Sequence, residues 1–328
     1  MQLNNQIVNW GLLSFLLFGF YLLSFELQRT ETLSLLLTFS GLFFLLWFWI
    51  RNFSTLTSIF LLGIVCRLIF WNHIPALSQD FYRFIWDGNI QLLGINPYRY
   101  TPDEIINLID FPSSGILYEK MGNLSNNHYS NYPPISQYLF QFIAYFNRGD
   151  ILQPIFALRI IYMFGELFLF FGAKVLFEHF KIPSIYIAWY FLNPLVIVEG
   201  FGNLHGEPLM ITFTVFSWLY CFKKKPFLGG FFMTIAVGTK LLPLLLTPIF
   251  FRYLGLRKFL IYSFSLIIFS CVLWFPFLSE EMIKNYTQTI QLWFTTFEFN
   301  GSIYNIIRAI GYEIKGYNII RQLGKITP

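Results

Sequence analysis

Residues 77–98 read LSQDFYRFIWDGNIQLLGINPY and follow directly on an apolar run that is long enough to cross a bilayer. On a helix, Asp80, Arg83 and Asp87 occupy positions i, i+3 and i+7 and share one face, whereas the aromatic residues between them fall on another. This pattern predicts a helix that lies flat on the membrane with its charges outward. Two carboxylates and an arginine at the lipid–water boundary indicate chemistry on a lipid headgroup.

The composition of the whole chain is that of an integral membrane protein. Of its 328 residues, 56% are hydrophobic, 21% are aromatic and only 12% are charged, about half the charged share of ordinary soluble domains. The net charge of +5 is small and scattered through apolar sequence. It argues against nucleic acid as a partner and fits short basic loops beside membrane lipids.

Several apolar runs are interpreted as membrane spans. They are residues 7–25, 33–50, 55–74, 154–177, 185–198, 208–222 and 259–278. The first run lacks the basic start and the cleavage site of a signal peptide, so it is expected to remain as a span. The chain is therefore predicted to be an all-α polytopic membrane protein with one domain, residues 1–328.

Polar sequence at residues 75–134 separates the third run from the fourth. This segment is far longer than a hairpin connection, which predicts a folded functional loop. The apolar run at 135–146 that follows is too short to cross a bilayer alone. It is interpreted as a re-entrant or interfacial helix on the side of the acidic loop.

The basic residues predict which ends of the spans are cytoplasmic. We expect the N-terminus to be cytoplasmic together with four basic groups: Arg51, 178–181, 223–225 and 252–258. This requires residues 227–251 to enter the membrane and return as a broken hairpin, whose middle at Gly238-Thr-Lys240 reaches the opposite face. The alternative is one ordinary span in which Lys240 snorkels to the surface or is paired. The hairpin places Asp80, residues 199–207 and residues 279–302 together on the extracytoplasmic side.

Charged residues inside apolar sequence need a partner, a cavity or an interface. Lys240 follows Gly238-Thr239 and precedes Leu241-Leu-Pro243, and a helix break there exposes the ammonium group to an aqueous pocket. A phosphate would stabilise it in that pocket. Arg159 and Glu166, by contrast, lie two turns apart on one helical face and are interpreted as completing helix packing.

A second polar cluster, Glu199-Gly-Phe-Gly-Asn-Leu-His-Gly-Glu-Pro208, lies between two predicted spans. Its glycines and its helix-starting proline predict a tight loop with exposed His205 and Glu207. This pair could orient a sugar hydroxyl or assist proton transfer. Alternatively, Glu207 only stabilises the positively charged N-terminal end of the next helix, and His205 is an ordinary loop residue. The histidines show no metal-ligand spacing, so no metal site is predicted.

The acidic loop and the C-terminal region allow further interpretations. Asp80 is alternatively only the N-cap of its helix, and Arg83 with Asp87 is only a surface ion pair. Residues 299–308 place Arg308 near the start of a helix after an external loop, where it is a candidate phosphate clamp. Five aromatic residues either stack on a sugar or form the interfacial belt: Phe81, Tyr82, Trp86, Tyr98 and Tyr100.

Five short motifs follow one another along the chain. They are Asp80-Phe-Tyr-Arg-Phe-Ile-Trp-Asp-Gly88, Gly94-Ile-Asn-Pro-Tyr98, Tyr132-Pro-Pro134, Asn203-Leu-His-Gly-Glu207 and Gly238-Thr-Lys240. In this order the set resembles the GT-C superfamily of polytopic glycosyltransferases, in particular its bacterial mannosyltransferase-like members. The resemblance covers most of the chain.

The resemblance implies a bundle of roughly 8–10 transmembrane helices whose large extracytoplasmic loop carries a catalytic acid. It implies transfer of a hexose, with mannose as the expected sugar, in the bacterial inner membrane. The implied donor is a polyprenyl-phosphate sugar and the implied acceptor is a lipid or a glycan. No cofactor, metal ion or nucleotide sugar is implied, and a single displacement inverts the anomeric centre.

The same resemblance suggests roles for the candidate residues. Asp80 is the base, and Asp87 is the second carboxylate of the catalytic loop. Three cations are candidates for stabilising the departing phosphate, Lys240 together with Arg308 or Arg83. His205 and Glu207 position the sugar or the acceptor.

The chain departs from many relatives in two ways. Three spans precede the acidic loop where many relatives have one, and the chain ends at Pro328 where further spans are expected, so it is interpreted as a shortened or incomplete member. A transporter or flippase of lipid-linked sugars also uses intramembrane charges, but it should show paired inverted halves. Polar groups gathered at one face favour an enzyme. A non-catalytic subunit of a transferase is the third possibility.

Overall fold

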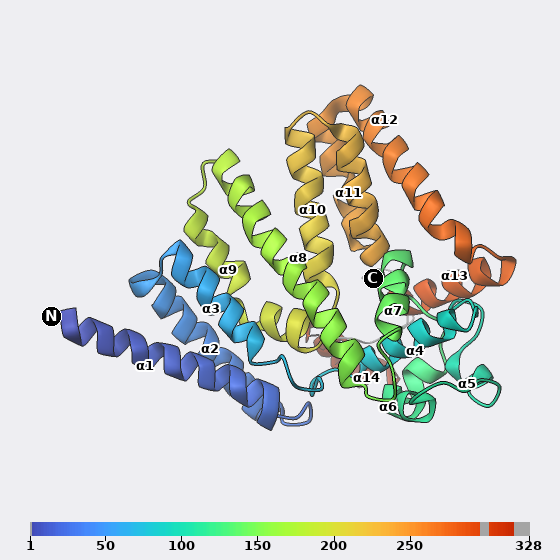
Figure 1. The fold of residues 1–328 in the computed structure, drawn as a ribbon, viewed down its shortest axis with the longest axis horizontal. Helices are drawn as coiled ribbons and strands as arrows, with labels where there is room; N and C mark the ends of the chain where they lie inside the picture. The colour runs from blue at the N-terminus through green and yellow to red at the C-terminus, as the bar shows by residue number, and fades with distance from the viewer. Residues whose placement is uncertain (1, 296–301, 318–328) are drawn as a thin grey trace.

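The computed structural model describes residues 2–295 and 302–317, and every regular element within these ranges is a helix. Four helical segments are long and apolar enough to cross a membrane: Gln6–Glu26, Thr32–Phe53, Leu152–His179 and Leu242–Phe277. A bent pair, Ser184–Phe191 with Val196–Gly202, makes a fifth if it is counted as one span. The prediction of an all-α polytopic membrane protein is confirmed (Figure 1).

The N-terminal part consists of two long helices and a shorter third. α1 (Gln2–Tyr21), extended by the π-helix Leu22–Glu26, packs against α2 (Thr32–Phe53). α3 (Leu56–Leu68) is shorter than the span predicted at 55–74. The helix ends at Leu68, before the end of the predicted span. The carbonyl of Trp71 instead accepts a hydrogen bond of 2.8 Å from Arg159 of α8 (Leu152–His179).

The span predicted at 185–198 is broken. A 3-10 helix (Ser184–Ile187) leads into α9 (Ala188–Phe191), and the π-helix η3 (Val196–Gly202) follows after a bend of 62°. Asn193 stabilises the break because its Oδ1 accepts the backbone N–H of Leu195 at 3.0 Å. The bend directs the end of η3 toward the acidic loop.

The acidic loop folds as a group of short helices. These are α4 (Asp80–Leu92), α5 (Pro102–Ile105) and α6 (Ser114–Asn126), followed by α7 (Pro134–Ala144), which corresponds to the short run predicted at 135–146. α4 and α7 are so close that a Cβ atom on Gly88 would lie 1.9 Å from the carbonyl oxygen of Phe140. α4 is therefore packed between its neighbours in the interior of the protein.

This burial corrects the prediction of a flat surface helix with outward charges. α6 covers one side of α4 and α7 covers another, so nearly every side chain from Phe81 to Gln91 is buried. The same packing corrects the interpretation of the aromatic residues, because Phe81, Trp86 and Tyr98 are core residues. Periodicity along one helix carries no information about neighbours that arrive later in the chain.

The predicted broken hairpin is confirmed. α10 (Glu207–Phe222) turns at Lys223-Lys-Lys225 into α11 (Pro226–Thr239), which packs along it and ends at Lys240, where the backbone is extended. A 3-10 helix (Leu242–Leu246) and the start of α12 (Thr247–Trp274) then return, and the ring of Tyr253 lies 5.2 Å from that of Phe222. The alternative of a single straight span is wrong.

α12 is itself divided at Gly255, whose φ of +69° no helical residue adopts. As a result, Phe250 stacks on Tyr262 with ring centroids 4.9 Å apart. In a straight helix these residues would be separated by roughly 18 Å along the axis. The second part of α12 leads to α13 (Glu280–Thr295), and α14 (Ser302–Lys315) is the last described helix.

Buried charges join the helices. Arg67 on α3 pairs with Glu166 on α8 at 3.0 Å, and neither side chain is exposed. Arg159 donates to the carbonyls of Trp71 and Gly202. Both arginines therefore have structural partners, as expected for charges inside a membrane bundle, and Glu166 pairs with Arg67 rather than with Arg159.

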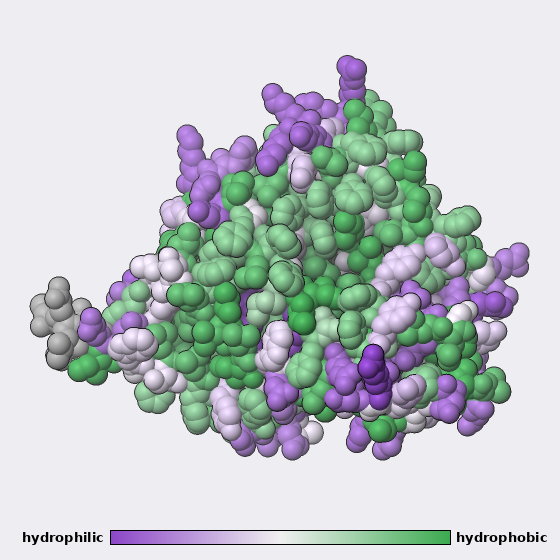
Figure 2. Space-filling view, viewed as in Figure 1, coloured by the Kyte–Doolittle hydropathy of each residue, from purple (hydrophilic) through white to green (hydrophobic). Residues whose placement is uncertain are grey.

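The face shown in Figure 2 has hydrophilic residues toward its top and its bottom and a hydrophobic band between them. The turn between α10 and α11, with exposed Lys223, Lys224 and Lys225, lies at one end of the bundle, and α4 lies toward the other (Figure 1). Because α10 has 16 residues, its two ends are separated by roughly 24 Å. The lysine turn and the loop before Glu207 are thus at opposite ends of one helix.

Candidate functional site

The structure brings Asp80 and His205 together although they are 125 positions apart. Asp80 is the first residue of α4, and His205 precedes α10. His205 Nε2 lies 3.5 Å from Asp80 Oδ2 and 3.1 Å from Ser78 Oγ. Ser78 Oγ also accepts the backbone N–H of Asp80 at 3.3 Å. Asp80 makes no side-chain cap of its helix, and its carboxylate remains 46% exposed.

The other imidazole nitrogen of His205 faces a third residue. Nδ1 lies 3.1 Å from Glu199 Oε2, and the same oxygen accepts the side-chain N–H of Asn203 at 3.1 Å. Glu199 belongs to the π-helix η3, in which the N–H of Asn203 bonds to the carbonyl of Val198 at 2.7 Å. After the π-helix ends at Gly202, the left-handed backbone of Leu204, with φ of +64°, turns the chain back and brings His205 to Glu199 and Asn203.

Lys240 and Glu207 form an ion pair beside this group. Lys240 stands at the end of α11, where Ser136 Oγ of α7 donates to the carbonyl of Thr239 at 2.8 Å. A Cβ atom on Gly206 would lie 3.3 Å from Thr239, so the loop before α10 and the end of α11 are in contact. The prediction that a helix break exposes Lys240 is confirmed, since its side chain is 36% exposed. We call Ser78, Asp80, Glu199, His205, Glu207 and Lys240 the acid–imidazole cluster.

The charges of the cluster determine its protonation. Burial disfavours the charged imidazole, but the hydrogen bonds to Asp80 and Glu199 outweigh it and raise the pKa of His205 to about 9. Burial would raise the pKa of Asp80, yet the hydrogen bond and charge of His205, with the charges of Lys240 and Arg29, lower it below its usual value. At neutral pH Asp80 is therefore a carboxylate beside an imidazolium ion.

Arg83 and Asp87 are arranged differently from Asp80. Arg83 Nε donates to Asp87 Oδ1 at 2.6 Å, and both side chains are buried. The guanidinium group also donates to the carbonyls of Ser125 and His128, and Asp87 Oδ2 accepts from Gln137 at 3.0 Å. The i,i+4 pair is present, but it is an interior pair that joins α4 to α6 and α7, and the expectation that these charges face outward is wrong.

Arg308 lies on α14, half-buried. Residues 299–301, the first part of the loop predicted to carry this arginine, lie outside the described residues. Its proposed contact with a phosphate stays a prediction. Within residues 2–295 and 302–317, no three His, Cys, Asp or Glu side chains are arranged to hold a metal ion.

Sequence reasoning found Asp80, His205, Glu207 and Lys240 but assigned no role to Ser78 or Glu199. Ser78 is two residues before Asp80, and Glu199 is six residues before His205. His205 lies three residues beyond the π-helix, and the left-handed backbone of Leu204, with φ of +64°, turns the chain back toward Glu199. Spacing along a helix therefore does not reveal the contact. The position of an acid in the same polar loop was the one available signal.

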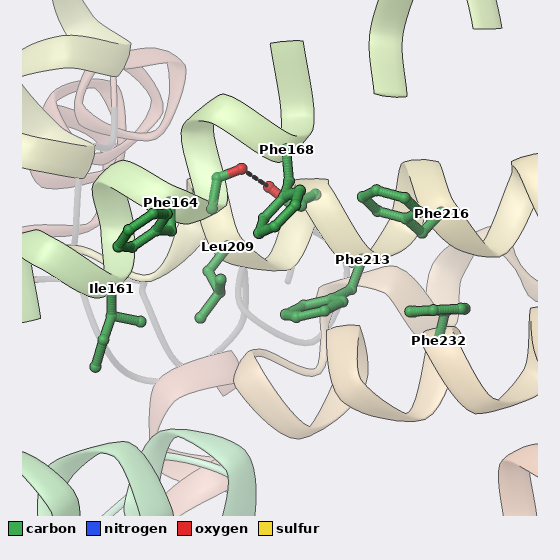
Figure 3. A pocket seen from close by; sticks show the side chains of 9 residues that line it. Ile161, Phe164, Phe168, Leu209, Phe213, Phe216 and Phe232 are labelled. Atoms are coloured by element: carbon green, nitrogen blue, oxygen red, sulfur yellow. Dashed lines mark hydrogen bonds between the residues drawn. The ribbon is translucent and has the colours of Figure 1, made fainter. Parts of the chain in front are cut away.

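An apolar cavity of about 420 Å³ lies between α8, α10 and α11. Figure 3 shows its phenylalanine side chains, with the hydrogen bond between Thr212 and the carbonyl of Gly165 behind them. Two of its lining residues are close in sequence to the loop that carries the cluster. Leu209 is two residues after Glu207. Ile161 precedes Tyr162, whose hydroxyl lies beside Gly206. The lining residues are Ile161, Phe164, Gly165, Phe168, Leu209, Thr212, Phe213, Phe216 and Phe232.

The fold and the cluster define a helical polytopic membrane protein with a titratable site at one end of its bundle. The chain belongs to the family described as "Alpha-(1->6)-mannopyranosyltransferase, N-terminal domain", whose sequence model matches residues 17–254. The predicted resemblance to bacterial mannosyltransferases is thereby confirmed. The matched range contains all of the acid–imidazole cluster and excludes Arg308.

Two relatives carry the same description. "Alpha-(1->6)-mannopyranosyltransferase A" of Corynebacterium glutamicum is 22% identical over 200 residues, which cover 61% of this chain and 39% of that protein. A "Probable alpha-(1->6)-mannopyranosyltransferase" of Mycolicibacterium smegmatis is 23% identical over 138 residues, which cover 42% of this chain and 24% of that protein. The chain thus aligns with less than half of either relative's length. No solved structure matches the chain.

Proposed function

We propose that this protein is a membrane glycosyltransferase that moves a mannosyl group from a polyprenyl-phosphate donor to a hydroxyl of a lipid or glycan acceptor. The observation that carries the proposal is the carboxylate of Asp80, which is partly exposed and is held by an imidazolium from a distant loop. The names of the two relatives support a mannosyl group as the transferred sugar. The reaction takes place at the extracytoplasmic face.

In this mechanism Asp80 is the general base. The acceptor oxygen attacks the anomeric carbon, its proton passes to Asp80, and the bond between that carbon and the phosphate oxygen breaks. The lowered pKa of Asp80 keeps it ionised and ready to accept the proton at neutral pH. One displacement inverts the anomeric centre, and no metal ion takes part.

The departing phosphate needs a positive charge. Lys240 supplies it, because its side chain is partly exposed and its charge acts on Asp80. Glu207 holds Lys240 in place and can accept a hydrogen bond from a sugar hydroxyl. Arg83 contributes to the fold instead, since all its contacts described above lie within the protein.

The apolar cavity accommodates the first part of the donor's prenyl chain. It extends along α10 from Leu209 to Phe216, roughly 10 Å, and Leu209 is two residues after Glu207 of the cluster. A ligand with its phosphate at Lys240 and an apolar tail fits this arrangement of charge followed by hydrocarbon surface. The membership in a mannosyltransferase family favours this function over a flippase of lipid-linked sugars.

Transfer by the purified full chain tests the proposal. We expect labelled mannose to move from polyprenyl-phosphate mannose to a membrane glycolipid or glycan fraction, and not from a nucleotide-linked mannose. A short-chain donor that cannot fill the cavity should show a higher KM than the long-chain donor. Equal use of the nucleotide-linked sugar would contradict the assignment of the donor.

A further inference from the structure

Glu199 contacts the proposed base only through His205. Its Oε2 atom lies 3.1 Å from His205 Nδ1, whereas His205 Nε2 is the atom that faces Asp80 and Ser78. We propose that Glu199 is a positioning residue that keeps His205 oriented and positively charged, and thereby holds Asp80 as an oriented carboxylate. This inference rests on the proposed function.

The two acids beside the imidazole favour its doubly protonated form. A neutral imidazole has one N–H donor, but here Nδ1 and Nε2 each face a carboxylate, which can only accept. Both carboxylates can accept an N–H of the ring only when it is an imidazolium, whereas a neutral ring would accept the Ser78 hydroxyl at Nε2, 3.1 Å away. The raised pKa of His205, about 9, favours the imidazolium. Turning the ring over would exchange its nitrogens and carbons and lose both contacts, so the two acids also fix its orientation.

The backbone around Glu199 is built to hold His205. The backbone N–H of His205 bonds to the carbonyl of Glu199 at 3.0 Å, so this one residue binds His205 through both its main chain and its side chain. Asn203, which is buried, donates to the Glu199 carboxylate and limits its rotation. A Cβ atom on Gly200 would lie 2.3 Å from the ring of Pro208, so the turn is tightly packed against the start of α10.

The surrounding charges come from five parts of the chain, of which one, Arg29, lies in the loop before α2. Asp80 of α4, Glu199 of η3 and Glu207 of α10 all favour the charged form of His205, and Lys240 after α11 acts on Asp80 together with Arg29. With Glu199 present, the pKa of His205 is raised to about 9, so the imidazolium is present below that pH and lost above it. Removing the charge of Glu199 lowers this pKa and moves the loss to lower pH.

This arrangement has a consequence for the proton that leaves the acceptor. Asp80 must accept that proton without first taking one from His205. The charge of Glu199 keeps the proton on the imidazole, because it stabilises the imidazolium from the side opposite Asp80. His205 thus stays a cation while Asp80 changes from carboxylate to acid.

The test combines a titration with a rate profile, both on the full chain. Histidine ring resonances of ¹⁵N-labelled protein in detergent, without substrate, report the pKa of His205, which His205→Gln identifies by the loss of one signal. In Glu199→Gln we expect this pKa to fall from about 9 toward its usual range. The alkaline limb of the transfer rate should move to lower pH by the same amount.

Two further variants separate charge from packing. Glu199→Asp keeps the charge, so its alkaline limb should stay near that of the unchanged protein even if its rate falls. Glu178→Gln removes an exposed glutamate that pairs with Lys174 and serves as the matched control.

The outcomes are distinct. An unchanged pKa of His205 in Glu199→Gln overturns the inference whether or not the protein transfers sugar. A lowered pKa with an unmoved alkaline limb overturns it as well, because the charge of His205 would then not act on the reaction. If the unchanged protein transfers no sugar from any donor, the proposed function fails, and the titration still decides whether Glu199 controls the charge of His205.

Discussion

Replacing Asp87 with Asn should destabilise the protein far more than the same change at Asp80. The Asp87 carboxylate is fully buried and accepts from Arg83 through one oxygen and from Gln137 through the other. The side chain of Asn has one oxygen that accepts and one NH2 group that donates. In the variant Arg83 therefore has a neutral partner, and the new NH2 group faces an N–H donor of either Arg83 or Gln137. Breaking a buried ion pair from one side costs about 3–5 kcal/mol.

That cost is a large share of the 5–15 kcal/mol by which native proteins are typically stable. The measurement is the thermal unfolding midpoint of the purified protein in detergent. Asp87→Asn should lower it clearly, whereas Asp80→Asn, at a partly exposed pair, should cost no more than about 1 kcal/mol. Glu281→Gln, at the exposed pair with Arg99, is the control and should leave the midpoint unchanged.

The double variant Arg83→Met with Asp87→Leu removes both charges and should recover part of the loss, because no unpaired charge remains buried. Recovery is incomplete, since Arg83 also binds the carbonyls of Ser125 and His128. If Asp87→Asn unfolded at the same temperature as the unchanged protein and yet lost all transfer, the structural role of this pair would be refuted and Asp87 would belong to the chemistry.

Two other predictions concern the donor and the orientation. Lys240→Met should weaken binding of the polyprenyl-phosphate sugar by roughly 10- to 100-fold, as expected for losing a charge-assisted hydrogen bond, and unchanged donor affinity would refute the contact. Single cysteines at Ala76 and Lys224, both exposed, in a chain lacking Cys66, Cys221 and Cys271, should respectively react with and resist an impermeant thiol reagent on intact cells. The reverse pattern would place the acid–imidazole cluster on the cytoplasmic side.

The sequence was sufficient for the features that depend on local pattern. Long apolar runs predicted the long helices, and the Gly-Thr-Lys-Leu-Leu-Pro stretch predicted the break at Lys240. Proline and glycine disfavour a helix through their own backbone, whatever the helix packs against. The charge of the lysine turn and the extended backbone at Lys240 agreed on a hairpin. Each of these signals is contained in a few neighbouring residues.

What failed depended on contacts between distant segments. Arg83 and Asp87 have the pattern of a surface pair, and only the arrival of α6 and α7 makes them an interior pair. The partner of Glu166 is Arg67, about 100 residues away, which no spacing reveals. Glu199 was missed because helical periodicity of 3.6 residues separates it from His205, whereas the left-handed backbone of Leu204, after the end of the π-helix, turns the chain back and brings them together.

The most direct test of the account is the transfer rate of Asp80→Asn, measured with polyprenyl-phosphate mannose on protein shown to be folded. The amide keeps the shape of the side chain and cannot accept the proton, so the rate should fall by about 10²–10⁴-fold with little change in donor binding. Turnover close to that of the unchanged protein would contradict the role of Asp80 as the base.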